Sequence, residues 1–254
     1  MADAAEDGLV EATAKMLLEE KAMQFDQLVR QASKLVSEGN NLAKAVKQAK
    51  KAVALLPEMP SGHRTLGSAL EANASPTLAA EAFLLGMDKA DASLSEESSR
   101  TIWAECASSA YAMLVVCPDV PRPTWWEDAQ LLRLSERAVQ VTPESLRAQK
   151  WRADVLSGLQ SALPEYDDRT PQQLRDAAVH FQEVARLHSG ADAKRGMVKA
   201  GIACRARADA IEAHLASLQQ QCQGAGTAGG VGTTGEANET GGGQGGDVEA
   251  TYEY

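Results

Sequence analysis

Two adjacent segments of 34 residues decide the fold: DQLVRQASKLVSEGNNLAKAVKQAKKAVALLPEM at positions 26–59 and PSGHRTLGSALEANASPTLAAEAFLLGMDKADAS at positions 60–93. Small or apolar residues recur between them at one fixed offset. They are Ala32, Val36, Ala45, Ala49 and Ala52 in the first segment and Leu66, Leu70, Ala79, Phe83 and Gly86 in the second, with Gly67 at the place of Ser33. A period of this length is typical of stacked helix-pair repeats, in which one unit cannot bury its own apolar face. The sequence therefore predicts an all-α fold built from stacked antiparallel helix pairs.

Composition agrees with helix stacking and excludes some functions. Of the 254 residues 44% are apolar but only 4% are aromatic, so alanine must supply much of the packing. Alternating Val-, Ile- and Thr-rich runs with hairpin turns, which would indicate a sheet, are absent from the sequence. A net charge of −10 argues against bulk affinity for nucleic acid or an anionic membrane.

The compartment is predicted from the N-terminus and the cysteines. Residues 1–11 are acidic and lack the basic start and apolar core of a signal peptide, and no apolar run reaches the length of a membrane span. The four cysteines form no CxxC pair, and we expect Cys106, Cys117 and Cys204 to be buried and Cys222 to be an exposed thiol. We therefore expect a cytoplasmic protein with reduced cysteines, with the nucleus as an alternative.

The chain is expected to have three parts: an acidic segment with a short helix at 1–23, a helical repeat domain at 24–221, and a Gly-rich, disordered acidic tail at 222–254. Within the repeat domain, apolar spacing and helix-stop signals predict four helix pairs and a closing helix. The predicted helices are 25–37, 43–56, 62–72, 76–90, 96–116, 125–141, 145–163 and 171–188, with the C-terminal capping helix at 192–221. Two connections exceed the repeat norm, the proline-rich insertion at 118–123 and an acidic loop at 164–170.

Residues 60–93 resemble a tetratricopeptide repeat (TPR) in the spacing of Leu66-Gly67, Leu70, Ala79, Phe83 and Gly86, and residues 26–59 match more loosely, ending in Pro57. Val29 and His63 stand where the family usually has Trp, and the later units match in part. The resemblance covers about residues 24–220. It implies a TPR-like α-solenoid, a right-handed superhelix whose concave face is lined by the first helices of the pairs and binds peptides.

In the register of that family, Arg30, Lys34 and Arg64 fall on the face used for ligands. A small basic groove would attract a carboxylate-bearing, acidic peptide through charge-assisted hydrogen bonds. The alternative is that these long side chains simply solvate the first helices.

Two further features are candidates for partner contacts. Trp125 and Trp126 follow the proline-rich insertion, where one ring can pack inside while the other acts as an interface anchor; packing of both is the alternative. Lys44, Lys47, Lys50 and Lys51 place a basic stripe on the second predicted helix, suited to an acidic surface or to solvent alone.

Signatures of catalysis are absent from the sequence. There is no HExxH, no GxxxxGK[ST] and no GxSxG, and the four histidines show no metal-ligand spacing with cysteine. His180 and Glu183 lie one turn apart, which is more simply a solvated helix face. We therefore expect a non-enzymatic adaptor with no cofactor, metal or catalytic residue. The alternatives are a structural subunit of a larger, possibly cytoskeletal, assembly and a helical enzyme with an unrecognised site.

Overall fold

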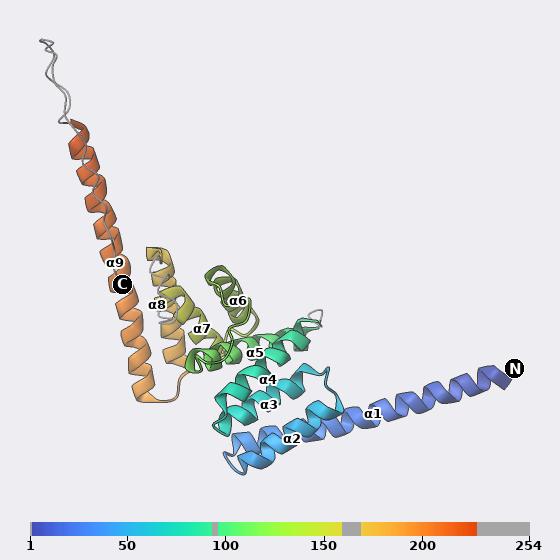
Figure 1. Ribbon diagram of the computed structural model, residues 1–254. Coiled ribbons are helices and arrows are strands. Elements are labelled where there is room, and N and C mark those ends of the chain that lie inside the picture. Colours follow the sequence, from blue (N-terminus) through green and yellow to red (C-terminus); the bar gives the residue numbers. More distant parts are fainter. Residues whose placement is uncertain (1, 93–95, 159–168, 228–254) are drawn as a thin grey trace, which may run out of the picture. The chain divides into compact units, whose positions relative to one another are not determined.

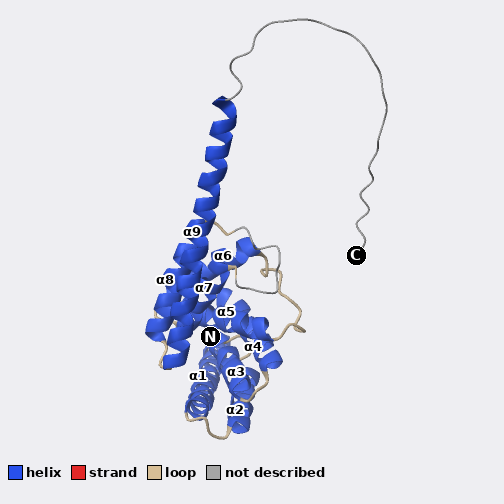
Figure 2. Ribbon diagram, turned by 90° about the vertical axis from the view of Figure 1, so that its left-hand side faces the viewer, coloured by secondary structure: helices blue, strands red, loops and turns tan. Residues whose placement is uncertain are grey.

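The computed structural model describes residues 2–92, 96–158 and 169–227, and within these ranges all regular secondary structure is helical (Figures 1 and 2). The all-α prediction is confirmed. The helices are α1 (Ala2–Ser37), α2 (Leu42–Leu55), α3 (Pro60–Ala72), α4 (Pro76–Asp91), α5 (Glu97–Val116), α6 (Asp128–Val141), α7 (Leu146–Ser157), α8 (Pro171–Leu187) and α9 (Ala191–Thr227). The predicted tail from residue 228 onward and most of the acidic loop lie outside the described residues.

The chain divides into two units, Met1–Glu212 and Ala213–Tyr254, and the described part of the second is the end of α9. Within the first unit each helix from α1 to α7 packs on the next one along the chain. In addition, α1 packs on α3, α3 on α5, and α5 on α7. The first helices of the four predicted pairs therefore follow one another as direct neighbours, and they build the surface described below.

Two predicted boundaries at the chain's ends are wrong. The short leading helix and the helix at 25–37 form one continuous helix, α1, because no Gly or Pro interrupts the sequence from Leu9 to Ser37. At the other end, α9 runs to Thr227 rather than to Gln221.

Two boundaries in the later half also differ from the prediction. The sixth helix begins at Asp128 rather than at Trp125, because the amide of Trp126 donates to the carbonyl of Pro123 in a turn that precedes the helix. The seventh ends at Ser157 rather than at Leu163, where Gly158 adopts a left-handed φ of 67° and serves as the C-cap.

Small residues pack α1 to α4. The contacts of α1 with α2 and α3 are built from Ala32, Ala45, Ala49 and Ala69, all fully buried. Gly67 permits the closest approach, because a Cβ added there would lie 2.6 Å from Cδ1 of Phe83. Of the residues predicted to pack the repeats, Ala32, Ala45, Ala52, Gly67, Leu70, Ala79, Phe83 and Gly86 are buried, and Val36 and Leu66 are half-buried.

Aromatic rings pack the region from α5 to α7. The ring of Tyr111 on α5 stacks on Trp126 and on Trp151, with centroid separations of 5.4 and 5.3 Å. The guanidinium of Arg137 lies 3.9 Å from the ring centroid of Trp103, whose side chain is also buried. Large residues therefore fill the core where the sequence departs from the regular repeat.

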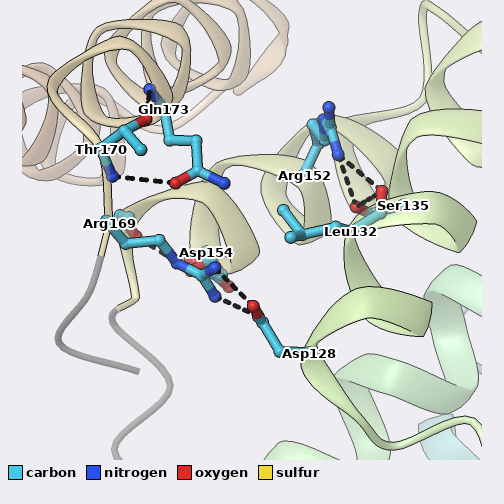
Figure 3. Close-up of polar contacts among 9 residues, drawn as sticks. Asp128, Leu132, Ser135, Arg152, Asp154, Arg169, Thr170 and Gln173 are labelled. Atoms are coloured by element: carbon cyan, nitrogen blue, oxygen red, sulfur yellow. Dashed lines mark hydrogen bonds and ion pairs between the residues drawn. The ribbon is translucent and has the colours of Figure 1, made fainter. Parts of the chain in front are cut away.

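Polar contacts tie the later helices together (Figure 3). Arg169, 7% exposed, donates from both terminal nitrogens to the two carboxylate oxygens of Asp128, with one of the distances at 2.8 Å. Arg152 of α7 donates to the carbonyl of Leu132 on α6 at 2.6 Å. Thr170 begins α8 with a capping box, in which its hydroxyl accepts from the amide of Gln173.

Candidate functional site

A groove of about 550 Å³ runs along the neighbouring helices α1, α3 and α5 to the start of α7. Seven of its lining residues carry a hydroxyl group: Ser33, Ser37, Thr65, Ser68, Ser108, Ser109 and Ser145. The remaining lining residues are Val36, Arg64, Phe83, Glu105, Leu146 and Arg147. We call this surface the hydroxyl groove.

Helical spacing explains why these residues share one surface. Ser33 and Ser37 of α1 lie four residues apart, as do Arg64 and Ser68 of α3. Positions i and i+4 of a helix project on the same side, so each helix presents one polar edge. The direct packing of α1 on α3 and of α3 on α5 then brings these edges together.

One ion pair crosses the hydroxyl groove between α3 and α5. Nη1 of Arg64 lies 2.5 Å from Oε2 of Glu105, and both side chains are about one third exposed, at 34% and 39%. An arginine has five N–H donors. This contact uses one of them, so Arg64 keeps donors for a ligand while its orientation is fixed.

Arg147 joins α7 to the same surface. Its Nη1 donates to Oγ of Ser109 on α5 at 2.9 Å, and its Nη2 donates to Oε1 of Glu71 on α3 at 2.6 Å. Each of the two groove arginines is therefore balanced by one carboxylate. The groove carries oriented donors without a large net charge.

The wall between α3 and α4 combines a buried hydroxyl with an apolar ring. Thr65 is 3% exposed, and its Oγ1 has no hydrogen-bond partner among the described residues. Beside it, the ring of Phe83 lies against the backbone of Gly67 and supplies an apolar part of the lining.

Arg64 is the one residue of the predicted basic groove that lines the hydroxyl groove. Arg30 and Lys34 lie on α1 with exposed side chains outside the lining set, and Lys34 is 3.8 Å from Glu38. No local sequence pattern pointed to Glu105 and Arg147. Their partners are separated by 41 and 76 residues along the chain, so no local spacing links them. The available signal was the recurrence of Ser on or next to each of the first helices.

Trp125 and Trp126 lie in the connection before α6. Trp126 is 8% exposed and stacks on Tyr111, and the guanidinium of Arg122 covers its ring at 4.5 Å. Trp125 is half-buried, with its ring centroid 6.3 Å from that of Trp151. Both rings therefore belong to the aromatic packing of α5 to α7, and neither lines the hydroxyl groove.

The predicted lysine stripe is exposed on α2. Lys44, Lys47, Lys50 and Lys51 all reach solvent, and none of them forms an ion pair with another described residue. Lys44, Lys47 and Lys51 line a shallow depression with Ala43 and Gln48.

The titratable groups of the described residues do not converge on a reaction centre. Nδ1 of His180 is 2.7 Å from Oε1 of Gln149, whereas Glu183 accepts from Arg186, so the His180 and Glu183 pair is divided between different partners. Burial lowers the pKa of His180 and raises the pKa of the Cys106 thiol to about 12, which disfavours its thiolate. No cluster of three or more metal-ligating side chains occurs within the described ranges.

Cys106, Cys117 and Cys204 are buried and Cys222 is exposed, which confirms the prediction for the thiols. No helix in the described part of the chain combines the length and the hydropathy needed to cross a bilayer. Comparison with protein-family models and with curated protein sequences finds no match to this chain.

Proposed function

We propose that this protein is a non-enzymatic adaptor that holds a peptide or a peptide-like segment of a partner protein in the hydroxyl groove. The observation that carries the proposal is the lining itself: seven hydroxyl side chains and two arginines, oriented by ion pairs, along four successive first helices. A cytoplasmic location is part of this proposal.

The dimensions and the chemistry of the groove suit a short extended segment. A volume of about 550 Å³ falls within the usual range of ligand sites. Ser33 and Ser37 are exposed and Ser68 is half-buried, and their hydroxyl groups can both donate to and accept from the backbone of an extended segment. The unused donors of Arg64 and Arg147 favour a carboxylate on the ligand. The ligand that we propose is therefore a peptide with at least one acidic group.

A tetratricopeptide-like solenoid is the finer architecture that we propose. Its support is the fixed 34-residue offset together with the direct packing of α1, α3, α5 and α7, which places the first helix of each pair on one surface. In such an array the groove lies on the concave side and the second helices lie outside.

The test is selection from a phage-displayed random peptide library against the purified protein. Ser68→Trp fills the groove with a ring, and Thr77→Trp places the same ring at an exposed position of α4 as the matched control. We expect wild type and Thr77→Trp to enrich the same peptides and Ser68→Trp to lose them. Equal enrichment by all three proteins contradicts the proposal.

A charge exchange tests the part that Arg64 plays. Arg64→Glu combined with Glu105→Arg keeps an ion pair between α3 and α5 but exchanges the positions of its charges. We expect unchanged helicity and a changed set of enriched peptides, with weaker selection of acidic residues. An unchanged peptide set shows that Arg64 does not contact the ligand.

A second candidate function, a structural subunit of a larger assembly, is favoured by the lysine stripe on α2. Four exposed lysines without ion pairs in the described structure, on a chain with a net charge of −10, suit an acidic surface of a partner. Replacing Lys44, Lys47 and Lys51 by Glu tests it without touching the core. If the triple variant still co-migrates with a large particle, the lysine stripe does not hold the protein in an assembly.

A further inference from the structure

A second, narrower groove is lined by α2, α3 and α4 and has a volume of about 210 Å³. Successive residues of an α-helix point about 100° apart, so the residues that α3 contributes here lie away from Arg64 and Ser68, which line the hydroxyl groove. We call the second surface the α2–α4 groove. Its apolar lining is Val53 of α2, Leu66 and Leu70 of α3, and Leu78, Ala82 and Leu85 of α4.

Helical spacing gives the α2–α4 groove its length. Leu78, Ala82 and Leu85 lie at positions i, i+4 and i+7, which share one side of α4. The helix α3 packs on both α2 and α4 (Figure 1), so Leu66 and Leu70 lie between the other two helices. From Leu78 to Leu85 the groove spans about 10 Å, or two turns of α4.

The wall that α4 supplies is only half covered. Leu78 and Leu85 are each 49% exposed, whereas Ala82 between them is buried. Apolar side chains in this state gain free energy when a second apolar surface covers them. The groove is smaller than the usual site of a small molecule. It therefore suits individual side chains of a partner protein.

Charged side chains flank the apolar lining. Lys50 of α2 lies on one wall and Glu81 of α4 on the other, and neither forms an ion pair with another described residue. On α2 the positive charge continues through the exposed Lys44, Lys47 and Lys51, and this helix contains no acidic residue. A ligand that lies along α2 is therefore attracted when the edge that it turns towards this helix is acidic.

From the apolar lining and the positive wall we propose that a partner protein docks an amphipathic helix with an acidic edge in the α2–α4 groove. Its apolar side chains, at positions i, i+3 or i+4, and i+7, repeat over the same two turns as Leu78 and Leu85. Its acidic edge faces Lys50. The proposal rests on the second candidate function, since it names the partner that the lysine stripe meets, and it is independent of the hydroxyl groove.

The first test measures binding of a model helix to the purified full chain by fluorescence anisotropy. The probe is a fluorescein-labelled peptide of about 18 residues, with leucines at every third or fourth position and glutamates along one edge. We expect saturable binding by wild type. A peptide of the same composition, with its leucines distributed around the helix, should bind at least about tenfold more weakly, because it has no apolar face.

Substitutions in the apolar wall test where the probe lies. Leu78→Ser combined with Leu85→Ser should raise the dissociation constant by about tenfold or more, because two apolar contacts are lost. Val179→Ser combined with Ile202→Ser is the matched control, since these side chains are 59% and 58% exposed on α8 and α9. The control should bind as wild type does. All four side chains reach solvent, so both variants should keep the fold, which circular dichroism verifies.

A charge reversal tests the acidic edge. Lys50→Glu should weaken binding by about threefold to tenfold, and Lys194→Glu makes the same change at an exposed position of α9 and should not. Raising the salt from about 50 mM to about 500 mM should weaken wild type more than Lys50→Glu, because salt screens exposed charges. Ser68→Trp, which fills the hydroxyl groove, should bind the probe as wild type does.

Four results overturn the proposal. One is the absence of saturable binding by wild type, and another is equal binding of the peptide with distributed leucines. The third is weaker binding in Lys50→Glu without any effect of the leucine pair; an acidic partner then meets the lysine stripe outside the groove, and the second candidate function stands. The fourth is a different occupant. Binding to phosphatidylserine vesicles that the leucine pair abolishes indicates a membrane, and self-association that the same variant abolishes indicates a second copy.

Discussion

Different side chains pack the helix pairs from α1 to α4 and the helices from α5 to α7. In the first region fully buried alanines such as Ala32 and Ala49 let backbones approach closely. In the second, the stacked rings of Tyr111, Trp126 and Trp151 fill the core. The region that is packed with small residues keeps the regular repeat length, whereas the region that is packed with rings contains the proline-rich insertion at 118–123. Packing with small residues therefore preserves the repeat, and large rings accommodate its irregularity.

The largest expected difference between the regions concerns the removal of a buried side chain. Trp151 is fully buried against Tyr111, so Trp151→Ala should lower the free energy of unfolding by about 3–5 kcal/mol. Ala49→Gly removes a fully buried methyl group from the first region and should cost about 1 kcal/mol. Urea unfolding followed by circular dichroism measures both. Similar losses in the two variants would show that the rings are not the main support of the second region.

The next difference concerns ion pairs. Asp128→Asn removes a carboxylate from the nearly buried Arg169 and should cost about 1–3 kcal/mol, since hydrogen bonds to charged groups are strong and the guanidinium stays buried. In the first region, Glu58 is 79% exposed in its pair with Lys89, so Glu58→Gln should change stability by less than about 0.5 kcal/mol. Thermal unfolding of the two variants gives the comparison. If the Asp128→Asn protein is as stable as wild type, the ion pair between Asp128 and Arg169 does not stabilise the second region.

A third prediction tests how tightly the small residues pack. Gly67→Ala places a methyl group against Phe83, where the ring must shift, and should destabilise the protein by about 1–2 kcal/mol. Gly196→Ala on α9 is the matched control, because no atom lies within 4 Å of the added Cβ, and it should stabilise by up to about 1 kcal/mol. If the two substitutions shift the unfolding midpoint in the same direction, the close approach at Gly67 does not limit the packing.

The difference in packing between the two regions also explains which parts of the fold could be predicted from the sequence. The spacing of Leu66, Leu70, Ala79 and Phe83 located α3 and α4 because local apolar periodicity records which helix face is buried. The start of α6 was misplaced, because Trp126 is held by a ring stack with Tyr111 that leaves no periodic signal.

The candidate site was predictable in part for the same reason. Arg64 was found from its place in the repeat, whereas Arg147 lines the hydroxyl groove through contacts with Ser109 and Glu71, far away along the chain. Such contacts depend on the packing of α7 against α5, and a single sequence does not record that distance.

The smallest effect concerns pH and arises where His180 of α8 contacts Gln149 on α7 of the second region. Burial is the main cause that lowers the pKa of His180 below its usual 6.5, and the positive charge of Arg152 adds to it. The unfolded chain therefore binds a proton more readily than the folded chain. The contribution of neutral His180 to stability is present above pH 6.5 and is lost as the pH falls through the lowered folded pKa. His180→Asn places an amide nitrogen near the position of Nδ1, which can keep the contact with Gln149, but it cannot titrate. The free energy of unfolding, measured in urea at intervals from about pH 7 to pH 5, should fall more steeply for wild type than for His180→Asn. Parallel curves would mean that the loss of stability in acid arises at other groups, and that His180 packs in α8 without sensing pH.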